Sequence, residues 1–328
     1  MDQRFLYGFQ QVGIGVSNIQ AAVKWYATVL LADIKVLEDS NPATYMAPYM
    51  GNQPRQKTAI ILMNQHGGGG FELWQHTEHK PTSGPLVTRG DLGINCVVIY
   101  TSHLEKAKAH FRHHQVPIKT IDDKIIEITD PFGNAIRIAE KSLSDKILLT
   151  GVHECLVGIS NTEKAISFYR SFGFEVANQY REKTLHITTL NCPNRATGRL
   201  GTFLGECKIQ LLERTEGNPK KIYDNRIWGD PGYIHLCFDV YNLKSWVMHF
   251  DQVSPFTVLS NPDFTMGQAQ GHWGYLEDPD GTLIEMVEAH YVPIVKKLGL
   301  SINLRKRSPL KPLPNWLIKA MRLKKVRF

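Results

Sequence analysis

Side chains that bind divalent metal ions or move protons recur at corresponding places along this sequence. Glu154 and His235 each begin a strand-like run that leads into a helix-like pattern. Glu285 lies in the strand-like segment that ends the stretch of chain begun by His235, seven residues after Asp278. Imidazole and carboxylate groups are ligands for divalent ions, and a carboxylate can also carry a proton. These residues are therefore candidates for a metal site or an acid–base site.

The elements that position these residues follow a pattern that the sequence repeats four times. In three copies, an Asn lies seven positions and an aromatic residue fifteen positions after the first residue. These copies are QVGIGVSNIQAAVKWY from Gln11, ECLVGISNTEKAISFY from Glu154 and HLCFDVYNLKSWVMHF from His235. Because the Asn side chain accepts a hydrogen bond from an exposed backbone N–H, we expect a helix to begin after each Asn. A fourth copy, CVVIYTSHLEKAKAHF, begins at Cys96 and has His103 at the Asn position.

Strand-like segments follow each predicted helix and end in an apolar run. The final runs are FELW from Phe71, IRIAE from Ile136, KIQLLE from Lys208 and LIEMVE from Leu283. Copies two and four also share a turn before the last strand, DPFGN from Asp130 and DPDGT from Asp278, in which Asp, Pro and Gly provide the turn chemistry. The order of one strand, one helix and three strands predicts an α+β fold of four βαβββ modules.

Length, cysteine usage and apolar runs narrow the class of protein. A chain of 328 residues is long enough for two domains, each with a core of its own. No run of about 18 apolar residues occurs, and the first residues lack the order of a signal peptide. The five cysteines are scattered singly and form no CxxC pair. We therefore predict a soluble protein of the reducing cytoplasm.

The positive net charge of +7 belongs to one end of the chain. Eleven of the 38 Lys and Arg residues, and none of the Asp and Glu residues, lie between 292 and 328. The remainder has 27 basic residues against 31 acidic ones and is slightly acidic. Such a charge distribution argues against nucleic acid as a partner of the protein body.

The strand–turn–helix with its aromatic ending, together with the DPxGxxxE ending at Asp278, resembles the vicinal oxygen chelate superfamily. This superfamily includes glyoxalase I, methylmalonyl-CoA epimerase, fosfomycin and bleomycin resistance proteins, and extradiol ring-cleaving dioxygenases. The resemblance covers residues 8 to 290. It implies that modules pair so that eight strands curl around one cleft. We therefore expect one barrel-like domain over residues 1–146, a second over 147–291 and a basic tail over 292–328.

The resemblance also implies a metal site, because the ligands of this superfamily come from the first and last strands of each module. The four ligand positions of the second domain are filled by Glu154, Gln210, His235 and Glu285. His153 replaces Glu154 if the strand register slips by one residue. This set suits one divalent ion, namely Zn, Mn, Co, Ni or Fe(II).

The equivalent positions of the first domain hold a different set of side chains. They are Gln11, Glu72, Cys96 (Asn95 if the register slips) and Arg137. Because a guanidinium repels a cation, the first domain is expected to be metal-free. Arg137 would then pair with Glu72, or bind a carboxylate or phosphate ligand.

Three functions are compatible with such a site and a small-molecule substrate. In an isomerase, epimerase or lyase, the metal would chelate vicinal oxygens of the substrate while Glu285 or Glu154 moved a proton. In an Fe(II) extradiol-type dioxygenase, His153, His235 and Glu285 would bind iron and Tyr275 would act as acid and base. Alternatively, Tyr275 is a core aromatic residue on a strand. The third alternative is a small-molecule-binding protein without catalysis.

The tail has a proline-spaced linker followed by a short helical stretch from Asn315 with apolar residues among basic ones. A basic amphipathic helix can lie on an anionic membrane surface or dock onto an acidic partner. Residues 305–328 are therefore a candidate for peripheral membrane or partner binding. Alternatively, the tail packs on the acidic body or stays mobile.

Overall fold

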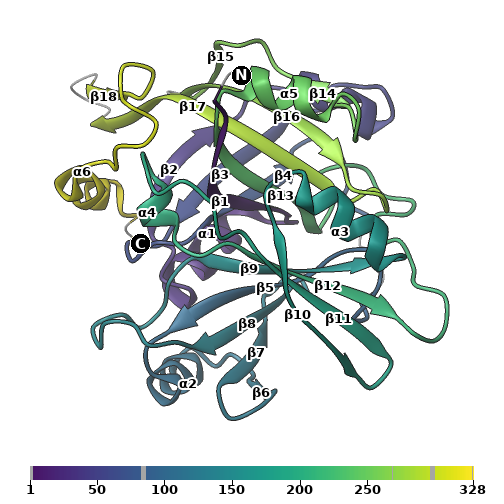
Figure 1. Ribbon diagram of the computed structural model, residues 1–328. Helices are drawn as coiled ribbons and strands as arrows, with labels where there is room; N and C mark the ends of the chain where they lie inside the picture. Colours follow the sequence, from purple (N-terminus) through teal and green to yellow (C-terminus); the bar gives the residue numbers. More distant parts are fainter. Residues whose placement is uncertain (1–2, 83–85, 268, 296–299, 327) are drawn as a thin grey trace.

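The computed structural model describes residues 3–82, 86–267, 269–295, 300–326 and 328, and it contains the four predicted modules in order (Figure 1). Module 1 consists of β1 (Phe5–Gly15), α1 (Ile19–Val29), β2 (Ile34–Asp39), the 3-10 helix η1 (Thr44–Met50), β3 (Lys57–Met63) and β4 (Gly70–His76). Module 2 consists of β5 (Gly93–Thr101), α2 (Leu104–His113), β6 (Lys119–Thr120), β7 (Ile125–Thr129) and β8 (Ala135–Glu140). The predicted α+β fold of βαβββ modules is confirmed.

The second half of the chain repeats the pattern and then adds the tail. Module 3 consists of β9 (Val152–Ile159), α3 (Thr162–Arg170), β10 (Glu175–Glu182), β11 (Leu185–Asn191), α4 (Gly201–Leu204) and β12 (Lys208–Arg214). Module 4 consists of β13 (Gly232–Tyr241), α5 (Leu243–Phe250), β14 (Val258–Leu259), β15 (Phe264–Met266), β16 (Ala269–Glu277) and β17 (Leu283–Val295). The tail forms β18 (Leu300–Asn303), α6 (Asn315–Ala320) and the 3-10 helix η3 (Met321–Lys324).

All four module helices begin directly after the repeated Asn or His position, and three of these positions cap the helix. The side chains of the N-cap residues accept hydrogen bonds of 3.0, 2.9 and 3.3 Å from backbone N–H groups; these residues are Asn18, Asn161 and Asn242. At the fourth helix the side chain of His103 makes no cap bond. Instead, Glu140 Oε1 accepts a hydrogen bond from the backbone N–H of Leu104, 2.9 Å away. Gln75 and Glu288 accept equivalent bonds from the first N–H groups of α1 and α5, where the Asn caps are present as well.

The strands assigned to the described residues form two sheets. One has ten strands in the order β14-β16-β17-β13-β1-β4-β3-β2, with β15 paired to β16 and β18 paired to β17. The other has eight strands in the order β10-β11-β12-β9-β5-β8-β7-β6. Antiparallel pairs of first strands, β1 with β13 and β5 with β9, lie at the centre of each sheet. Modules 1 and 4 therefore share one sheet, and modules 2 and 3 share the other.

This pairing corrects the expected grouping of residues 1–146 and 147–291, in which modules 1 and 2 would share one barrel and modules 3 and 4 the other. Within its own module, each first strand pairs with the last strand on one edge, so its other edge could pair with the first strand of any other module. The local sequence therefore does not specify the partner. The choice is made when the modules pack together.

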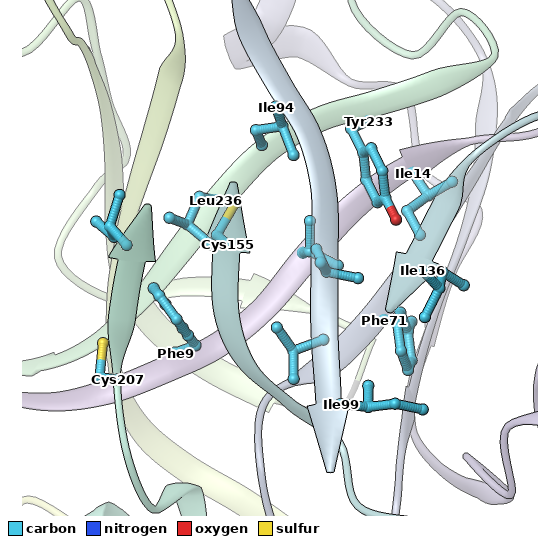
Figure 2. Close-up of a cluster of buried hydrophobic side chains, with 14 of the residues drawn as sticks. Phe9, Ile14, Phe71, Ile94, Ile99, Ile136, Cys155, Cys207, Tyr233 and Leu236 are labelled. Atoms are coloured by element: carbon cyan, nitrogen blue, oxygen red, sulfur yellow. The ribbon is translucent and has the colours of Figure 1, made fainter. Parts of the chain in front are cut away.

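The apolar faces of the two sheets meet in a shared core (Figure 2). Phe9 of β1 and Leu236 of β13 come from the ten-stranded sheet, and Ile136 of β8 and Cys155 of β9 come from the eight-stranded sheet. All of them belong to one buried cluster. The two sheets are thus held together by continuous apolar packing, which is the dominant favourable term in folding.

Two buried tyrosines connect modules that do not share a sheet. Tyr26 donates a hydrogen bond to Asp130 Oδ2 at 2.6 Å, and Tyr169 donates one to Asp278 Oδ2 at 3.2 Å. Each tyrosine is the aromatic residue that ends a repeated helix, and each aspartate begins a DPxG turn. Burial raises the pKa of Asp278 to about 6, although hydrogen bonds to the carboxylate, the backbone N–H of Thr282 among them, oppose this rise. The repeat therefore encodes two equivalent contacts, one in each half of the chain.

The tail packs on the body. Leu317 of α6 is buried in a cluster with Ile302, Leu304 and Leu313. Lys325 Nζ lies 2.7 Å from Asp33 Oδ2. This arrangement agrees with the alternative of a tail docked on the acidic body. Trp316 and Leu323 of the same segment are 65 % and 75 % exposed. These side chains are accessible to a membrane or a partner, and such a contact stays a prediction.

None of the described helices combines the length and the apolar character that crossing a bilayer requires.

Candidate functional site

Four polar side chains converge on four neighbouring strands of the ten-stranded sheet. They are Gln11 on β1, Glu72 on β4, His235 on β13 and Glu285 on β17. All four residues are buried. One ligand atom each from Glu72, His235 and Glu285 lies within 4.8 Å of the others. Modules 1 and 4 therefore build one compact polar site.

The distances within this site are short. His235 Nε2 lies 3.2 Å from Glu72 Oε2 and 3.1 Å from Glu285 Oε2, as ion pairs when the imidazole is protonated. Gln11 Nε2 donates to Glu72 Oε2 at 3.0 Å and to Glu285 Oε2 at 3.4 Å. The other amide atom, Gln11 Oε1, is buried without a hydrogen-bond partner. The oxygen and nitrogen of an amide are of similar size, so the side-chain amide of Gln11 can be flipped by 180°. A flipped amide would direct Oε1 toward the same two carboxylates.

A glycine makes room for this convergence. Gly13 on β1 lies opposite His235 on one side and Glu72 on the other side of the strand. A Cβ added at Gly13 would lie 2.2 Å from Cε1 and 2.4 Å from Nδ1 of His235. The imidazole therefore occupies the space that any other residue at position 13 would fill.

The electrostatics of His235 are dominated by burial and by the two carboxylates. Burial alone lowers its pKa, but the negative charges and hydrogen-bonding of Glu285 and Glu72 outweigh this and raise the pKa of His235 to about 9. The hydroxyl of Tyr275 lies 3.5 Å from Nδ1 of His235, and burial and the Glu285 charge raise the pKa of Tyr275. Tyr275 thus holds the far side of the ring while Nε2 points at the carboxylates.

The donor set fits a divalent metal ion. One imidazole, two carboxylates and one amide suit Zn, Mn, Co, Ni or Fe(II). Without a cation, two buried carboxylates would lie beside each other with one imidazole between them, and the amide oxygen of Gln11 would stay unpaired. The Glu72–His235–Glu285 group could therefore hold one metal ion, with Gln11 as a possible fourth ligand.

Only part of the set derived from the sequence meets in this site. His235, Glu285 and Tyr275 come together there. Glu154 lies on β9 and Gln210 on β12 of the eight-stranded sheet. His153, the alternative to Glu154, stacks on Tyr100 with ring centroids 4.5 Å apart. Their places in the cluster are taken by Glu72 and Gln11, which the sequence analysis assigned to a metal-free domain.

The ligand positions of modules 2 and 3 lie on the eight-stranded sheet, where their polar side chains pair with one another or with neighbouring side chains. Gln210 Nε2 donates to Glu154 Oε2 at 3.0 Å, and Tyr100 donates to Glu154 Oε1 at 2.7 Å. Arg137 Nε donates to Glu127 Oε2 at 3.0 Å and not to Glu72. This equivalent of the metal site is thus occupied by protein side chains.

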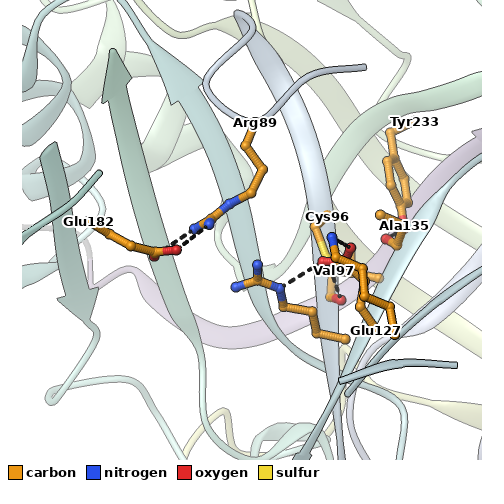
Figure 3. A network of polar contacts seen from close by, with 9 residues as sticks. Arg89, Cys96, Val97, Glu127, Ala135, Glu182 and Tyr233 are labelled. Atoms are coloured by element: carbon orange, nitrogen blue, oxygen red, sulfur yellow. Dashed lines mark hydrogen bonds and ion pairs between the residues drawn. The ribbon is translucent and has the colours of Figure 1, made fainter. Parts of the chain in front are cut away.

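Charge pairs extend this network toward the edge of the eight-stranded sheet (Figure 3). Arg89 forms a two-pronged pair with Glu182, with N–O distances of 2.7 and 3.2 Å. Cys96 takes the position that His235 has in the other half, and it lies opposite Leu156. Leu156 in turn takes the position of Gly13. Cys in place of His and Leu in place of Gly fill the space of the imidazole with apolar atoms.

The sequence does contain an indication that Gln11 and Glu72 belong to a metal site. Gln11 and Glu72 occupy ligand positions of module 1, and the glycine two residues after Gln11 has no counterpart two residues after Glu154. A small residue at that position is compatible with a large imidazole opposite it. The pairing of module 1 with module 4 was needed to turn this signal into a site.

Comparisons with known proteins agree with the fold. The family model described as the Glyoxalase/Bleomycin resistance protein/Dioxygenase superfamily matches residues 151–286. Glyoxalase I from Zea mays superposes with a TM-score of 0.60 at 12 % identity, over 87 % of this chain and 92 % of that chain.

A second structure has a similar fold. The putative dioxygenase from Bacillus subtilis subsp. subtilis str. 168 superposes with a TM-score of 0.61 at 13 % identity, over 87 % of this chain and 86 % of that chain. No curated protein sequence matched the chain. Family members bind a divalent metal and small-molecule substrates, which is consistent with the Glu–His–Glu group. Residues 151–286 are thus similar in sequence to the Glyoxalase/Bleomycin resistance protein/Dioxygenase superfamily, and the fold of the chain is that of the two-domain glyoxalase-like structures.

Proposed function

We propose that the protein is a metal-dependent isomerase, epimerase or lyase that acts on a small substrate with two neighbouring oxygen atoms. The observation that carries this proposal is the convergence of Glu72, His235 and Glu285, with ligand atoms within 4.8 Å of one another in a buried site. A divalent ion held there would bind both substrate oxygens and stabilise the negative charge that develops on them when a neighbouring C–H proton is removed.

The residues of the chain have separate tasks in this proposal. His235 holds its place because its ring is buried between Gly13 and Tyr275, and it serves as an anchor. Glu72 or Glu285 accepts the proton from one substrate carbon and returns it to the next, since a carboxylate in a buried site can move a proton between adjacent atoms.

The arrangement gives less support to the dioxygenase alternative. Fe(II) sites of that type use two histidines and one carboxylate. The cluster contains one histidine, and His153, which would have been the second, stacks on Tyr100 of the eight-stranded sheet. A binding protein without turnover has the same donor set and is distinguished by the absence of proton transfer.

Exchange of a substrate proton with solvent tests the proposal directly. Hydroxyacetone has two neighbouring oxygens and an acidic C–H, and its deuteration in heavy water can be followed by NMR with metal-loaded protein. We expect exchange with the wild type and with Glu154→Gln, whose carboxylate lies in the other sheet, and at least about a 100-fold loss with Glu285→Gln and Glu72→Gln.

Three other outcomes would contradict the proposal. Exchange that is unchanged in both cluster variants would place the proton carrier elsewhere. Metal bound at one equivalent without exchange of any hydroxyketone tested would favour a binding protein. Consumption of O2 with a catechol would favour the dioxygenase.

A further inference from the structure

A cavity of about 210 Å³ adjoins the metal-binding residues. Gln11, Glu72, Glu285 and Tyr275 line its inner end. Most of the remaining lining comes from the ten-stranded sheet, from η1 and from the C-terminal segment, and Leu200, Leu204 and Trp228 add to it. Since a water molecule in the liquid takes up about 30 Å³, the cavity has room for a group of several atoms beyond the two substrate oxygens.

Aromatic rings form a continuous wall from the metal-binding residues outward. Tyr275 packs edge-on against His235, with ring centroids 5.2 Å apart, and Trp273 packs edge-on against Tyr275 at 5.8 Å. Tyr45 and Phe264 each pack edge-on against Trp273 at 5.4 Å. Trp273, Tyr45 and Phe264 all line the cavity. A ligand in this cavity therefore lies against ring faces and edges over much of its length.

The C-terminal segment contributes another wall. Its apolar side chains that line the cavity are Leu313, Leu317, Ile318 and Met321. Figure 1 shows this segment in yellow at one side of the ten-stranded sheet, and the bridge between Ile34 and Lys325 fixes its end beside β2. The docked tail thus belongs to the binding cavity.

The lysines in the cavity lining already have partners. Lys57 is buried and forms an ion pair with Asp39. Lys324 Nζ donates to the backbone carbonyl of Val36 at 3.4 Å. By contrast, the indole N–H groups of Trp74 and Trp273 are buried without hydrogen-bond partners. These indole N–H groups can donate to uncharged oxygen atoms of a ligand, whereas a carboxylate or phosphate would lose its hydration in an apolar cavity whose lysines are already bonded to protein groups.

We propose that the substrate carries a bulky, uncharged apolar group next to its two oxygens, and that the C-terminal segment, through Met321 among others, forms the wall that accepts this group. The inference rests on the proposed function for the oxygen-binding end and adds the chemical class of the substrate. It also gives the tail a role in substrate selection.

A neutral apolar probe tests the cavity without the metal. N-phenyl-1-naphthylamine, whose fluorescence rises in apolar surroundings, is titrated into full-length protein kept in a chelator. We expect saturable binding with one probe per chain. Met321→Asp should weaken it at least tenfold, because a carboxylate would enter the apolar wall. Leu323→Asp, in the same short helix but 75 % exposed, should stay within twofold and serves as the matched control.

Hydroxamic acids then test the whole substrate class on metal-loaded protein, because they offer two neighbouring oxygens with a variable side group. Octanohydroxamic acid should bind at least 100-fold more tightly than acetohydroxamic acid, since each buried methylene contributes about fourfold in affinity. The hydroxamate of succinic acid, whose side group ends in a carboxylate, should bind no better than the acetyl compound. Met321→Asp should reduce the octanoyl preference and Leu323→Asp should not.

The two arms separate the failure of this inference from the failure of the proposed function. In one outcome, the wild type binds the probe, Met321→Asp does not, and no hydroxamate binds at all. This outcome would contradict the metal-dependent function and support the apolar cavity. Hydroxamates that bind with equal affinity for all side groups would support the metal site and overturn the inference. Equal probe affinity in the wild type and Met321→Asp, with both proteins folded by circular dichroism, would overturn it as well.

Discussion

Glu72 Oε2 lies 3.2 Å from His235 Nε2, although Glu72 belongs to the first module and His235 to the fourth. Gly13 on the strand between them lies opposite both residues, and its missing side chain lets them meet. This contact distinguishes the site in the structure from the set that the sequence analysis derived within one half of the chain. Substitutions can therefore distinguish the ligand set in the structure from the set derived from the sequence.

Metal content should depend on the residues of modules 1 and 4. We expect His235→Ala, Glu72→Gln and Glu285→Gln each to weaken metal binding by at least about 100-fold, because each removes a direct ligand. Glu154→Gln and Gln210→Ala should keep one equivalent of metal, because both residues lie on the other sheet. Elemental mass spectrometry on untagged protein, with calorimetric titration of Mn²⁺ or Zn²⁺, measures this. Loss of metal in Glu154→Gln with retention in Glu72→Gln would restore the set derived from the sequence.

Gly13→Ala should damage the site without removing any ligand. The new Cβ would lie 2.2 Å from the ring of His235, so the imidazole must move. We expect a loss of metal affinity of about tenfold or more and a loss of about 1–3 kcal/mol in the free energy of unfolding.

Val12→Ala is the matched control for this substitution. Val12 lies on the same strand and is buried in the core cluster, so its truncation destabilises the protein through the core. Metal affinity should stay unchanged in this variant. If Gly13→Ala also keeps wild-type affinity while losing stability, Gly13 does not position His235.

His153 should make stability depend on pH in the acidic range. Burial lowers its pKa to about 4 from an ordinary value of 6.5, an effect that a hydrogen bond with the Glu206 carbonyl partly offsets. Between these values the unfolded chain binds a proton that the folded protein does not. The contribution of His153 to stability is therefore complete above about pH 6.5 and is lost as the pH falls toward 4, by on the order of 3 kcal/mol.

His153→Phe keeps a ring that can stack on Tyr100 and removes the titrating group. Chemical unfolding at several pH values between 4 and 7 gives the free energy of unfolding of the variant and of the wild type. Other buried acids such as Asp278 contribute equally to both values, so their contribution cancels in the difference. This difference should shift in favour of the variant as the pH falls. A difference that is constant across this range would mean that His153 is protonated in the folded protein.

The docked tail should contribute to stability through Leu317. Truncation of this buried side chain by Leu317→Ala should lower the free energy of unfolding by about 2–4 kcal/mol. The adjacent Trp316 is 65 % exposed, and Trp316→Ala should change it by less than about 0.5 kcal/mol. Urea unfolding compares the two. Equal small effects would indicate a tail that leaves the body in solution.

Membrane or partner contact of the tail is tested separately. The exposed Trp316 and Leu323 lie among basic residues, which is the composition that predicts binding to an anionic surface. If that prediction holds, full-length protein floats with anionic liposomes and protein lacking residues 305–328 does not. Unchanged flotation after this deletion would exclude a membrane role for the tail.

The sequence by itself determined the modules and much of their local structure. The spacing of Asn18, Asn161 and Asn242 located three helix starts, because an N-cap acts within a few residues of its own position. Strand periodicity and the DPxG turns gave the module boundaries for the same reason. His235 and Glu285 were found because each lies in a complete local motif and because both belong to module 4.

Tertiary structure decided which modules share a sheet and hence which ligands meet. Each first strand could pair with that of another module, and the small residue Gly13, which suits an imidazole opposite it, favours the pair β1 and β13 without specifying it by itself. The choice depends on the shared core between the sheets and on long-range contacts such as that of Tyr169 with Asp278. Glu72 and Gln11 therefore join His235 only in the folded protein, where Gly13 leaves space for the imidazole and the tail completes the apolar cavity.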